Sequence, residues 1–140
     1  MSETVEGRLS LQLRNVMAAV DDPTRGEELR TLFTPEARFR LGNVAPVVGR
    51  EAIYADLGVS LHEHMPRMRH ELVTTWETHP TVFAEGLVHY WPDGTDGSHV
   101  ALPLLLRAHF SDDGLVSDLL AMMDRSASHP FRHEVEALEA

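Results

Sequence analysis

The segment LFTPEARFRLGNVAPVVGREAI, residues 32–53, encodes the end of one helix, an amphipathic strand, a loop and the start of another helix. Leu29, Leu32 and Phe33 follow helical spacing. Their helix should stop at Thr34, because Pro35 disfavours the α conformation of the residue before it.

The strand within this segment is expected to have one apolar face. Alternate strand residues point to opposite sides, which places Phe39, Leu41 and Asn43 together and the arginines between them on the other side. Pro46 should end the strand, and Gly49 supplies a permissive turn before the next helix.

The composition indicates one acidic domain. The 140 residues are enough for a single domain with its own core, which we expect over about residues 9–124, followed by a short tail at 125–140. The formal charge is −10, from 22 acidic and 12 basic residues, and every basic residue is arginine. Without lysine or cysteine, Schiff-base chemistry, thiolate catalysis, disulfides and thiolate metal sites are excluded.

Charge and hydropathy also bear on partners and location. An acidic chain without a basic patch argues against nucleic-acid binding. No apolar run approaches the length of a membrane span, and the N-terminus lacks the apolar core of a signal peptide. We therefore expect a cytoplasmic protein that does not bind a membrane.

Apolar spacing predicts three helices before most of the sheet. The first holds Leu9 and Leu13 and ends near residues 21–23. The second covers about residues 25–33, and the third about 51–64, with a break or kink at Gly58.

The later sequence changes to a two-residue period, which predicts strands. These strands cover about residues 69–78, 82–91, 100–110 and 115–123, separated by turns rich in glycine, proline and aspartate. Consecutive strands with short connections form a meander. The fold class is therefore α+β, with the helices gathered on one face of the sheet.

Two segments, PVVGREAI at residues 46–53 and DGLVSDLLAMMD at 113–124, occur within this order of elements. Together with residues 32–45, they resemble the SnoaL-like, nuclear transport factor two-like superfamily, over about residues 9–124. The resemblance implies a curved antiparallel sheet wrapped around N-terminal helices as a cone with one deep pocket, a cystatin-like α+β barrel. It also implies a small hydrophobic guest and homodimers that pair sheet to sheet.

The resemblance further implies where acid-base groups should lie. Ketosteroid isomerase relatives use a carboxylate base, an acid donor and a tyrosine donor, whereas relatives of limonene epoxide hydrolase hold a water with an Asp-Arg-Asp set. Both sets are missing, because the corresponding positions hold Leu41, Leu106 and Val16 for the first and Val88, Gly86 and Ala121 for the second.

Strand alternation predicts an apolar pocket wall suited to a terpenoid-like or polyketide-like molecule. The residues expected to bind substrate are Phe39, Leu41, Trp76, Val88, Leu102, Leu104, Leu106, Leu119 and Met123.

Three polar residues are predicted to converge on this wall as catalytic candidates. His70 is the candidate general acid-base group, because imidazole titrates near neutrality. Tyr90 would donate to an oxyanion or carbonyl, and Asn43 would orient a substrate oxygen or a water. Structural interpretations remain open: a hydrogen-bonded strand histidine, aromatic packing of Tyr90 against Trp76, and a turn-forming asparagine.

Asp118 is a reserve catalytic candidate. If Leu119 faces the cavity, Asp118 faces away and should pair with an arginine such as Arg107. In the SnoaL cyclase branch, however, an aspartate on a late strand is an acid-base residue, and a bulge would turn Asp118 inward.

Two histidine clusters raise the question of a metal, but we expect no metal and no other cofactor. His62 and His64 are two residues apart, so on a helix they point in different directions. His129 and His133 share a face only in a helix that includes residue 129, which Pro130 disfavours.

Three functions remain open from the sequence. The first is a cofactor-independent cyclase, isomerase or epoxide-opening enzyme acting on a hydrophobic oxygenated molecule. The second is a non-catalytic binding protein for such a molecule, and the third is a dimerisation module. Leu105, Leu120 and Met122 are expected on the outer sheet face, where they favour a homodimer.

Overall fold

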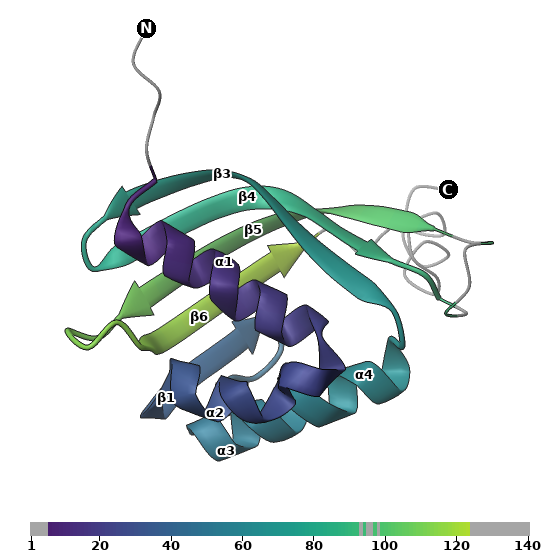
Figure 1. Cartoon of the computed structure of the whole chain (residues 1–140), viewed down its shortest axis with the longest axis horizontal. Coiled ribbons are helices and arrows are strands. Elements are labelled where there is room, and N and C mark those ends of the chain that lie inside the picture. The colour runs from purple at the N-terminus through teal and green to yellow at the C-terminus, as the bar shows by residue number, and fades with distance from the viewer. Residues whose placement is uncertain (1–5, 93, 95–96, 98, 124–140) are drawn as a thin grey trace, which may run out of the picture.

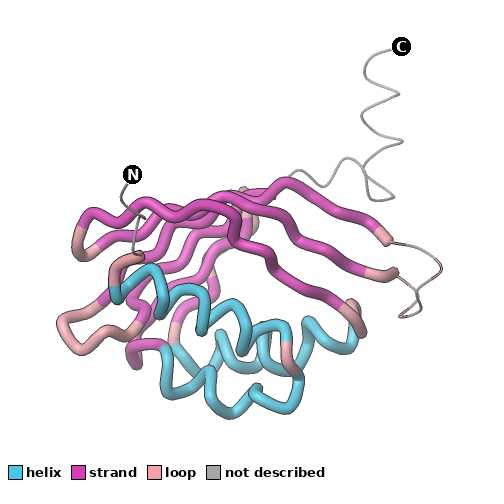
Figure 2. The backbone as a smooth tube through the Cα atoms, turned by 45° about the horizontal axis from the view of Figure 1, so that its top comes forward, coloured by secondary structure: helices cyan, strands magenta, loops and turns pink. Residues whose placement is uncertain are grey.

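One curved sheet carries all the described strands, and the helices lie against its concave face (Figure 1). The computed structural model describes residues 6–92, 94, 97 and 99–123. The expected tail at 125–140, with His129 and His133, lies outside these residues. Figure 2 shows the helical layer beneath the arched sheet, as expected for an α+β fold.

The helices are short except for the first. They are α1 (Arg8–Asp21), the 3₁₀ helix η1 (Pro23–Glu28), α2 (Leu29–Leu32), α3 (Arg50–Ile53), the π-helical segment η2 (Tyr54–Ser60) and α4 (Leu61–His64). The last three form one continuous helical run over residues 50–64. Its π-helical part contains Gly58, where the sequence predicts a break. The helix before β1 ends at Leu32, one residue earlier than predicted.

The sheet is mixed, which corrects the prediction of a purely antiparallel one. Its strands are β1 (Phe33–Leu41), β2 (Val47–Val48), β3 (Met68–Thr78), β4 (Thr81–Tyr90), β5 (Val100–Phe110) and β6 (Val116–Met123), in the order β2-β1-β6-β5-β4-β3. The last four strands form the predicted antiparallel meander. However, β1 pairs with β6 in parallel. Parallel strands need a long connection between them, and the chain from β2 through β5 supplies it between β1 and β6.

A bulge in β3 exchanges the two faces of that strand. Leu72 pairs with Gly86 and Thr74 with Glu85, so Val73 is an extra residue on β3. At the bulge, the backbones of β3 and β4 lie very close together. A Cβ atom added to Gly86 would lie only 1.8 Å from the carbonyl oxygen of Glu71. Beyond Val73, residues that strand alternation would direct inward are directed outward.

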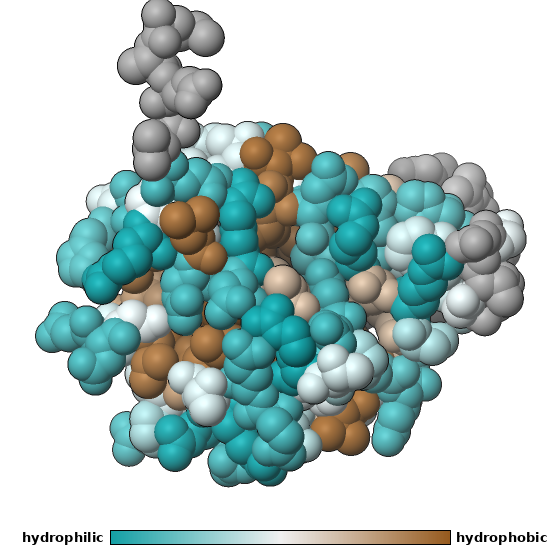
Figure 3. Space-filling model, viewed as in Figure 1, coloured by the Kyte–Doolittle hydropathy of each residue, from teal (hydrophilic) through white to brown (hydrophobic). Residues whose placement is uncertain are grey.

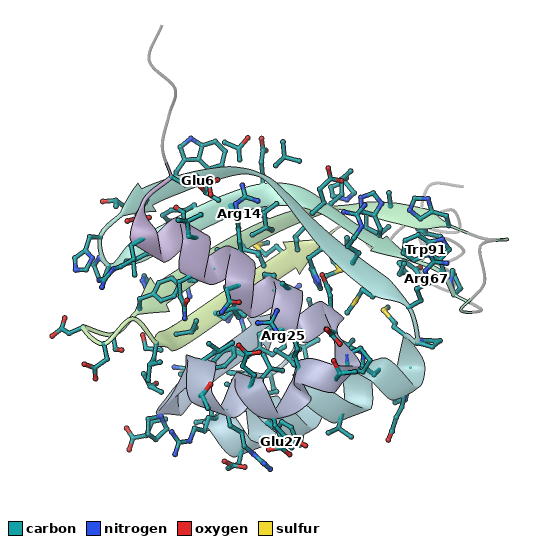
Figure 4. The ribbon with its side chains drawn as sticks, in the orientation of Figure 1. Glu6, Arg14, Arg25, Glu27, Arg67 and Trp91 are labelled. Atoms are coloured by element: carbon teal, nitrogen blue, oxygen red, sulfur yellow. The ribbon has the colours of Figure 1, made fainter. Side chains whose placement is uncertain are left out.

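Polar contacts hold α1 against β3. The Ser10 hydroxyl donates to Glu77 Oε1 at 2.9 Å. The Arg14 guanidinium binds Glu6, and its Nη1 donates to the carbonyl oxygen of Leu72 at 2.6 Å, beside the bulge. Figure 4 shows Glu6, just before α1, close to Arg14 in the middle of the helix. These contacts fix the helix over the sheet and thereby set the depth of the space between them.

Apolar side chains fill the region between helices and sheet, and Phe33, Leu13 and Ile53 are among the largest that are fully buried. The outer surface on the side of α1 is mainly hydrophilic, with separate apolar patches (Figure 3). Among the described residues, no helix has both the length and the apolar content needed to cross a bilayer.

Candidate functional site

A cavity of about 360 Å³ opens between the sheet, the C-terminal half of α1 and the helical run over residues 50–64. Its sheet wall includes most of the residues predicted to bind substrate: Phe39, Leu41, Val88, Leu102, Leu106, Leu119 and Met123. Met17 and Val20 of α1 form the opposite side with Leu57, Leu61 and Met65. The cavity is therefore lined mainly by apolar side chains, as expected for a site that takes a hydrophobic molecule.

His70 faces this cavity and is held by Asp21, the last residue of α1. Its ring Nδ1 lies 2.5 Å from Asp21 Oδ1, and its backbone N–H donates to Asp21 Oδ2 at 2.7 Å. The side chains are 7% and 15% exposed respectively. Because a carboxylate only accepts hydrogen bonds, Nδ1 carries a proton, and in the neutral ring Nε2 keeps its lone pair.

The end of α1 explains why Asp21 is in position. Pro23 stops the helix, since Asp22 before it adopts an extended backbone, and the Asp22 side chain accepts a hydrogen bond from the Thr24 amide. Asp21 therefore stands at the helix C-terminus, where the helix dipole disfavours a carboxylate. The two N–H donors of His70 offset that cost, so the pair depends on both partners.

Tyr90 lies beside His70 on the same concave face. His70 pairs with Val88, and Tyr90 is two residues further along β4, a diagonal position that places Cβ atoms about 7 Å apart. The Tyr90 side chain is buried and lines the cavity. Within the described part of the chain, its hydroxyl has no hydrogen-bond partner. The hydroxyl is therefore free to donate to a bound molecule.

A second polar group lines the helical wall. Asp56, Ser60 and His64 occur at four-residue steps along the run, and all three border the cavity. His64 Nδ1 lies 2.9 Å from the carbonyl oxygen of Ser60, so Nδ1 donates and Nε2 of the neutral ring is an acceptor. The cavity thus has polar groups on both walls.

Two predicted site residues lie away from the cavity. Trp76 is 52% exposed and pairs with Phe83 rather than Tyr90, because the bulge at Val73 turns this part of β3 outward. Asn43 is exposed in the turn after β1, since the strand ends at Leu41 before the alternation reaches it.

Two further residues predicted to belong to the site, Leu104 and Asp118, also lie outside the cavity lining. Leu104 is buried on the inner face but does not border this cavity. Asp118 faces outward and binds Arg107 through an Nη2–Oδ1 contact of 2.6 Å, which confirms the predicted ion pair and places this reserve candidate away from the cavity. The register of β6 does shift at Ser117, just before Asp118, but Asp118 still lies on the outer face with Arg107.

The sequence interpretation missed Asp21 and assigned no role to Asp56, Ser60 or His64. Asp21 is 49 residues from His70, and nothing in the local sequence links the two. Helical spacing of Asp56, Ser60 and His64 was a signal for a shared face. In the described residues, no group of three His, Asp or Glu side chains is arranged to hold a metal ion.

Comparison with protein families gives a match to the SnoaL-like domain over residues 13–119. The chain belongs to the SnoaL-like domain family. A comparison with curated proteins gives no match.

Several solved structures share the fold of this chain at low sequence identity. A proposed SnoaL-like polyketide cyclase from Shewanella denitrificans OS-217 superposes with a TM-score of 0.76 at 16% identity, covering 92% of this chain and 99% of that one. A second, from Jannaschia sp. CCS1, has a TM-score of 0.71 at 20% identity, with 89% and 94% covered.

A third similar structure is a hypothetical protein with a ketosteroid isomerase-like fold from Catenulispora acidiphila DSM 44928, in complex with trimethylamine. Its TM-score is 0.70 at 14% identity, with 84% of this chain and 85% of that chain covered. At these identities, the SnoaL-like chain shares the fold with all three proteins, while their chemistry is a separate question.

Proposed function

We propose that this SnoaL-like protein is a cofactor-independent enzyme that moves protons on a hydrophobic oxygenated small molecule, such as a polyketide or terpenoid intermediate. The Asp21–His70 pair at the wall of an apolar cavity is the observation that carries the proposal. A carboxylate that fixes the tautomer and orientation of an imidazole is the arrangement that makes histidine an effective general base.

The proposed step begins at a C–H bond next to a substrate carbonyl. His70 Nε2 takes the proton, and the electron pair of the broken bond moves onto the carbonyl oxygen as an enolate. The Tyr90 hydroxyl donates to this oxygen and stabilises the developing charge. Asp21 stabilises the imidazolium through Nδ1.

The enolate formed by His70, Tyr90 and Asp21 can proceed to an isomerisation or to a cyclisation. In an isomerisation, the imidazolium returns the proton to another carbon of the substrate. In a cyclisation, the enolate carbon attacks a second carbonyl of the same molecule, a C–C bond forms, and the resulting alkoxide takes the proton from His70. The apolar walls exclude water, which strengthens both hydrogen bonds.

A binding protein without catalysis is the second candidate. Leu41, Leu106, Val88 and Ala121 line the cavity at positions where the superfamily resemblance implies acid-base groups. A cavity with those positions apolar retains an apolar molecule by burial alone. The two candidates differ in whether a C–H bond of the guest is broken.

Deuterium exchange separates them without knowledge of the natural substrate. The bicyclic ketone 2-decalone is incubated with the protein in D2O, and NMR follows loss of the protons next to its carbonyl. The enzyme proposal expects exchange faster than in buffer, and a drop of about 100-fold or more in His70→Gln. Asp22→Asn is the matched control, because it changes the adjacent carboxylate at the same helix end.

Binding of 2-decalone, seen as shifts of cavity resonances, with exchange at the buffer rate would favour the binding protein. Exchange that is equally fast in wild type and His70→Gln would remove His70 from the proposal.

We also propose a homodimer joined through the outer sheet face, because Val73, Phe83, Leu105 and Met122 are exposed there.

A further inference from the structure

A second, polar cavity of about 150 Å³ lies on the outer face of the sheet, away from the apolar cavity. Its walls come from Arg38 and Arg40 of β1, Arg107 of β5, Asp118 and Leu120 of β6, and Pro46. Its volume is less than half of the 360 Å³ of the apolar cavity. It therefore accepts a small group and is too small for the guest of the apolar cavity.

Strand register brings the three guanidinium groups together. Leu120 of β6 pairs with Arg40 of β1 on one side and with Arg107 of β5 on the other. Arg38 of β1 pairs with Asp118, two residues before Leu120 on β6. Alternate residues of β1 point the same way, so Arg38 and Arg40 share the outer face. The arrangement therefore follows from the β1-β6-β5 order of the sheet.

The charges in this cavity do not balance. Asp118 binds Arg107 and is the one acidic residue among those that line the cavity. Among the described residues, neither Arg38 nor Arg40 has an ion pair or hydrogen-bond partner for its side chain. Three cations therefore face one anion, in a chain whose formal charge is −10.

Arg107 also has an unused donor. Its Nε–H is buried and has no acceptor in the described structure, although Nη2 binds Asp118. A buried donor without an acceptor is unfavourable, and so are like charges on neighbouring strands. An anion in the cavity would offset both costs.

We propose that this outer cavity is a binding site for a small oxyanion, with phosphate as the best match. Guanidinium groups bind phosphate and carboxylate oxygens through paired N–H donors, and three of them suit a group with several equivalent oxygens. The site is separate from the Asp21–His70 pair, so the protein would bind a phosphate-bearing metabolite there in addition to the guest of the apolar cavity.

Isothermal titration calorimetry with inorganic phosphate tests the site, with chloride and acetate at equal ionic strength as comparisons. Wild type should bind phosphate more tightly than acetate and show no heat with chloride. Arg40→Gln should weaken phosphate binding at least 10-fold, and Arg38→Gln/Arg40→Gln should abolish it. Arg69→Gln is the matched control, since Arg69 is an exposed arginine on β3, and it should leave binding unchanged.

Both arginines of β1 are exposed, so the variants should fold, which circular dichroism checks. Absence of phosphate binding by wild type would overturn the proposal. Equal weakening by Arg40→Gln and Arg69→Gln would also overturn it, because it would show general charge attraction. Loss of a dimer in Arg40→Gln, with no phosphate binding in wild type, would assign the cluster to a subunit interface instead.

Discussion

Asp21 binds His70 through both carboxylate oxygens, Oδ1 to the ring Nδ1 and Oδ2 to the backbone N–H. The backbone bond fixes the carboxylate, and the carboxylate then fixes the ring. The tautomer of His70 is thus set by a residue at the end of a helix and not by any neighbour on its own strand.

Asp21→Asn should reverse this tautomer. The backbone N–H of His70 still needs an acceptor, so the amide oxygen should remain there and the amide NH2 should face Nδ1. Nδ1 must then accept, and the proton moves to Nε2, which removes the base. Imidazole ¹⁵N NMR should show protonated Nε2, and 2-decalone exchange should fall about 100-fold or more. A retained Nδ1–H ring with unchanged exchange would contradict the proposed role of Asp21.

Tyr90→Phe should affect activity more than stability. The hydroxyl makes no hydrogen bond to described residues, so its removal should change the free energy of unfolding by less than about 1 kcal/mol. Loss of a donor to a developing oxyanion should slow exchange about 100-fold. Urea unfolding and the deuterium assay measure the two effects. The reverse pattern, with stability lost and exchange intact, would make Tyr90 a packing residue.

Gly86→Ala should be strongly destabilising. The new Cβ atom would lie 1.8 Å from the Glu71 carbonyl oxygen, so the backbones of β3 and β4 would have to separate at the bulge. We expect a loss of about 3 kcal/mol in the free energy of unfolding, measured by urea denaturation. Glu85→Ala, at the exposed adjacent position, should change stability by less than about 0.5 kcal/mol. Similar stability of both variants would show that the bulge is not tightly packed.

Glu6 should contribute to stability in a pH-dependent way. The hydrogen bond from Arg14 lowers the pKa of the Glu6 carboxyl below its ordinary value of 4.5. Because the folded pKa is lower than the unfolded one, the stabilisation is complete above pH 4.5 and is lost as the pH falls through the folded value. The difference in unfolding free energy between wild type and Glu6→Gln should therefore be constant above about pH 5.5 and shrink below about pH 4.5.

Glu63→Gln is the control for Glu6→Gln, because Glu63 is an exposed acid with no ion pair among the described residues. A difference between wild type and Glu6→Gln that grows as the pH falls would contradict the sign of this prediction.

Leu105→Glu should disrupt the proposed homodimer. Leu105 is 55% exposed in the middle of the outer face, and a carboxylate there would lose hydration in a sheet-to-sheet contact. Size-exclusion chromatography with light scattering should give a dimeric mass for wild type and a monomeric mass for the variant. Val59→Glu, on the helical side, is the matched control. A monomeric wild type would refute the proposal.

Local sequence patterns predicted most of the fold. Proline and glycine marked the limits of the helices, and two-residue alternation located the meander, because both signals act within a few residues. The parallel pairing of β1 with β6 was not predictable in this way, since it depends on which sheet edge remains free. The inward positions of Val88 and Leu106 followed from alternation alone.

The candidate site was only partly predictable for a similar reason. His70 was found because its strand alternates regularly up to Leu72, whereas Trp76 was placed wrongly because alternation fails beyond the bulge. Asp21 depends on a contact across 49 residues, and its signal in the sequence is only that of a helix end. A tertiary contact of this kind leaves no pattern in the local sequence.

The pairing of β1 with β6 has a consequence for synthesis of the chain. The strand that forms one wall of the apolar cavity, β1, gains its second neighbour only from β6, about 80 residues later in the chain. Until β6 has been synthesised, one edge of β1 is unpaired, and the cavity lacks Leu119, Ala121 and Met123 from its wall. The proposed binding of a ligand in this cavity therefore requires β6, and a chain that ends before β6 should not bind it.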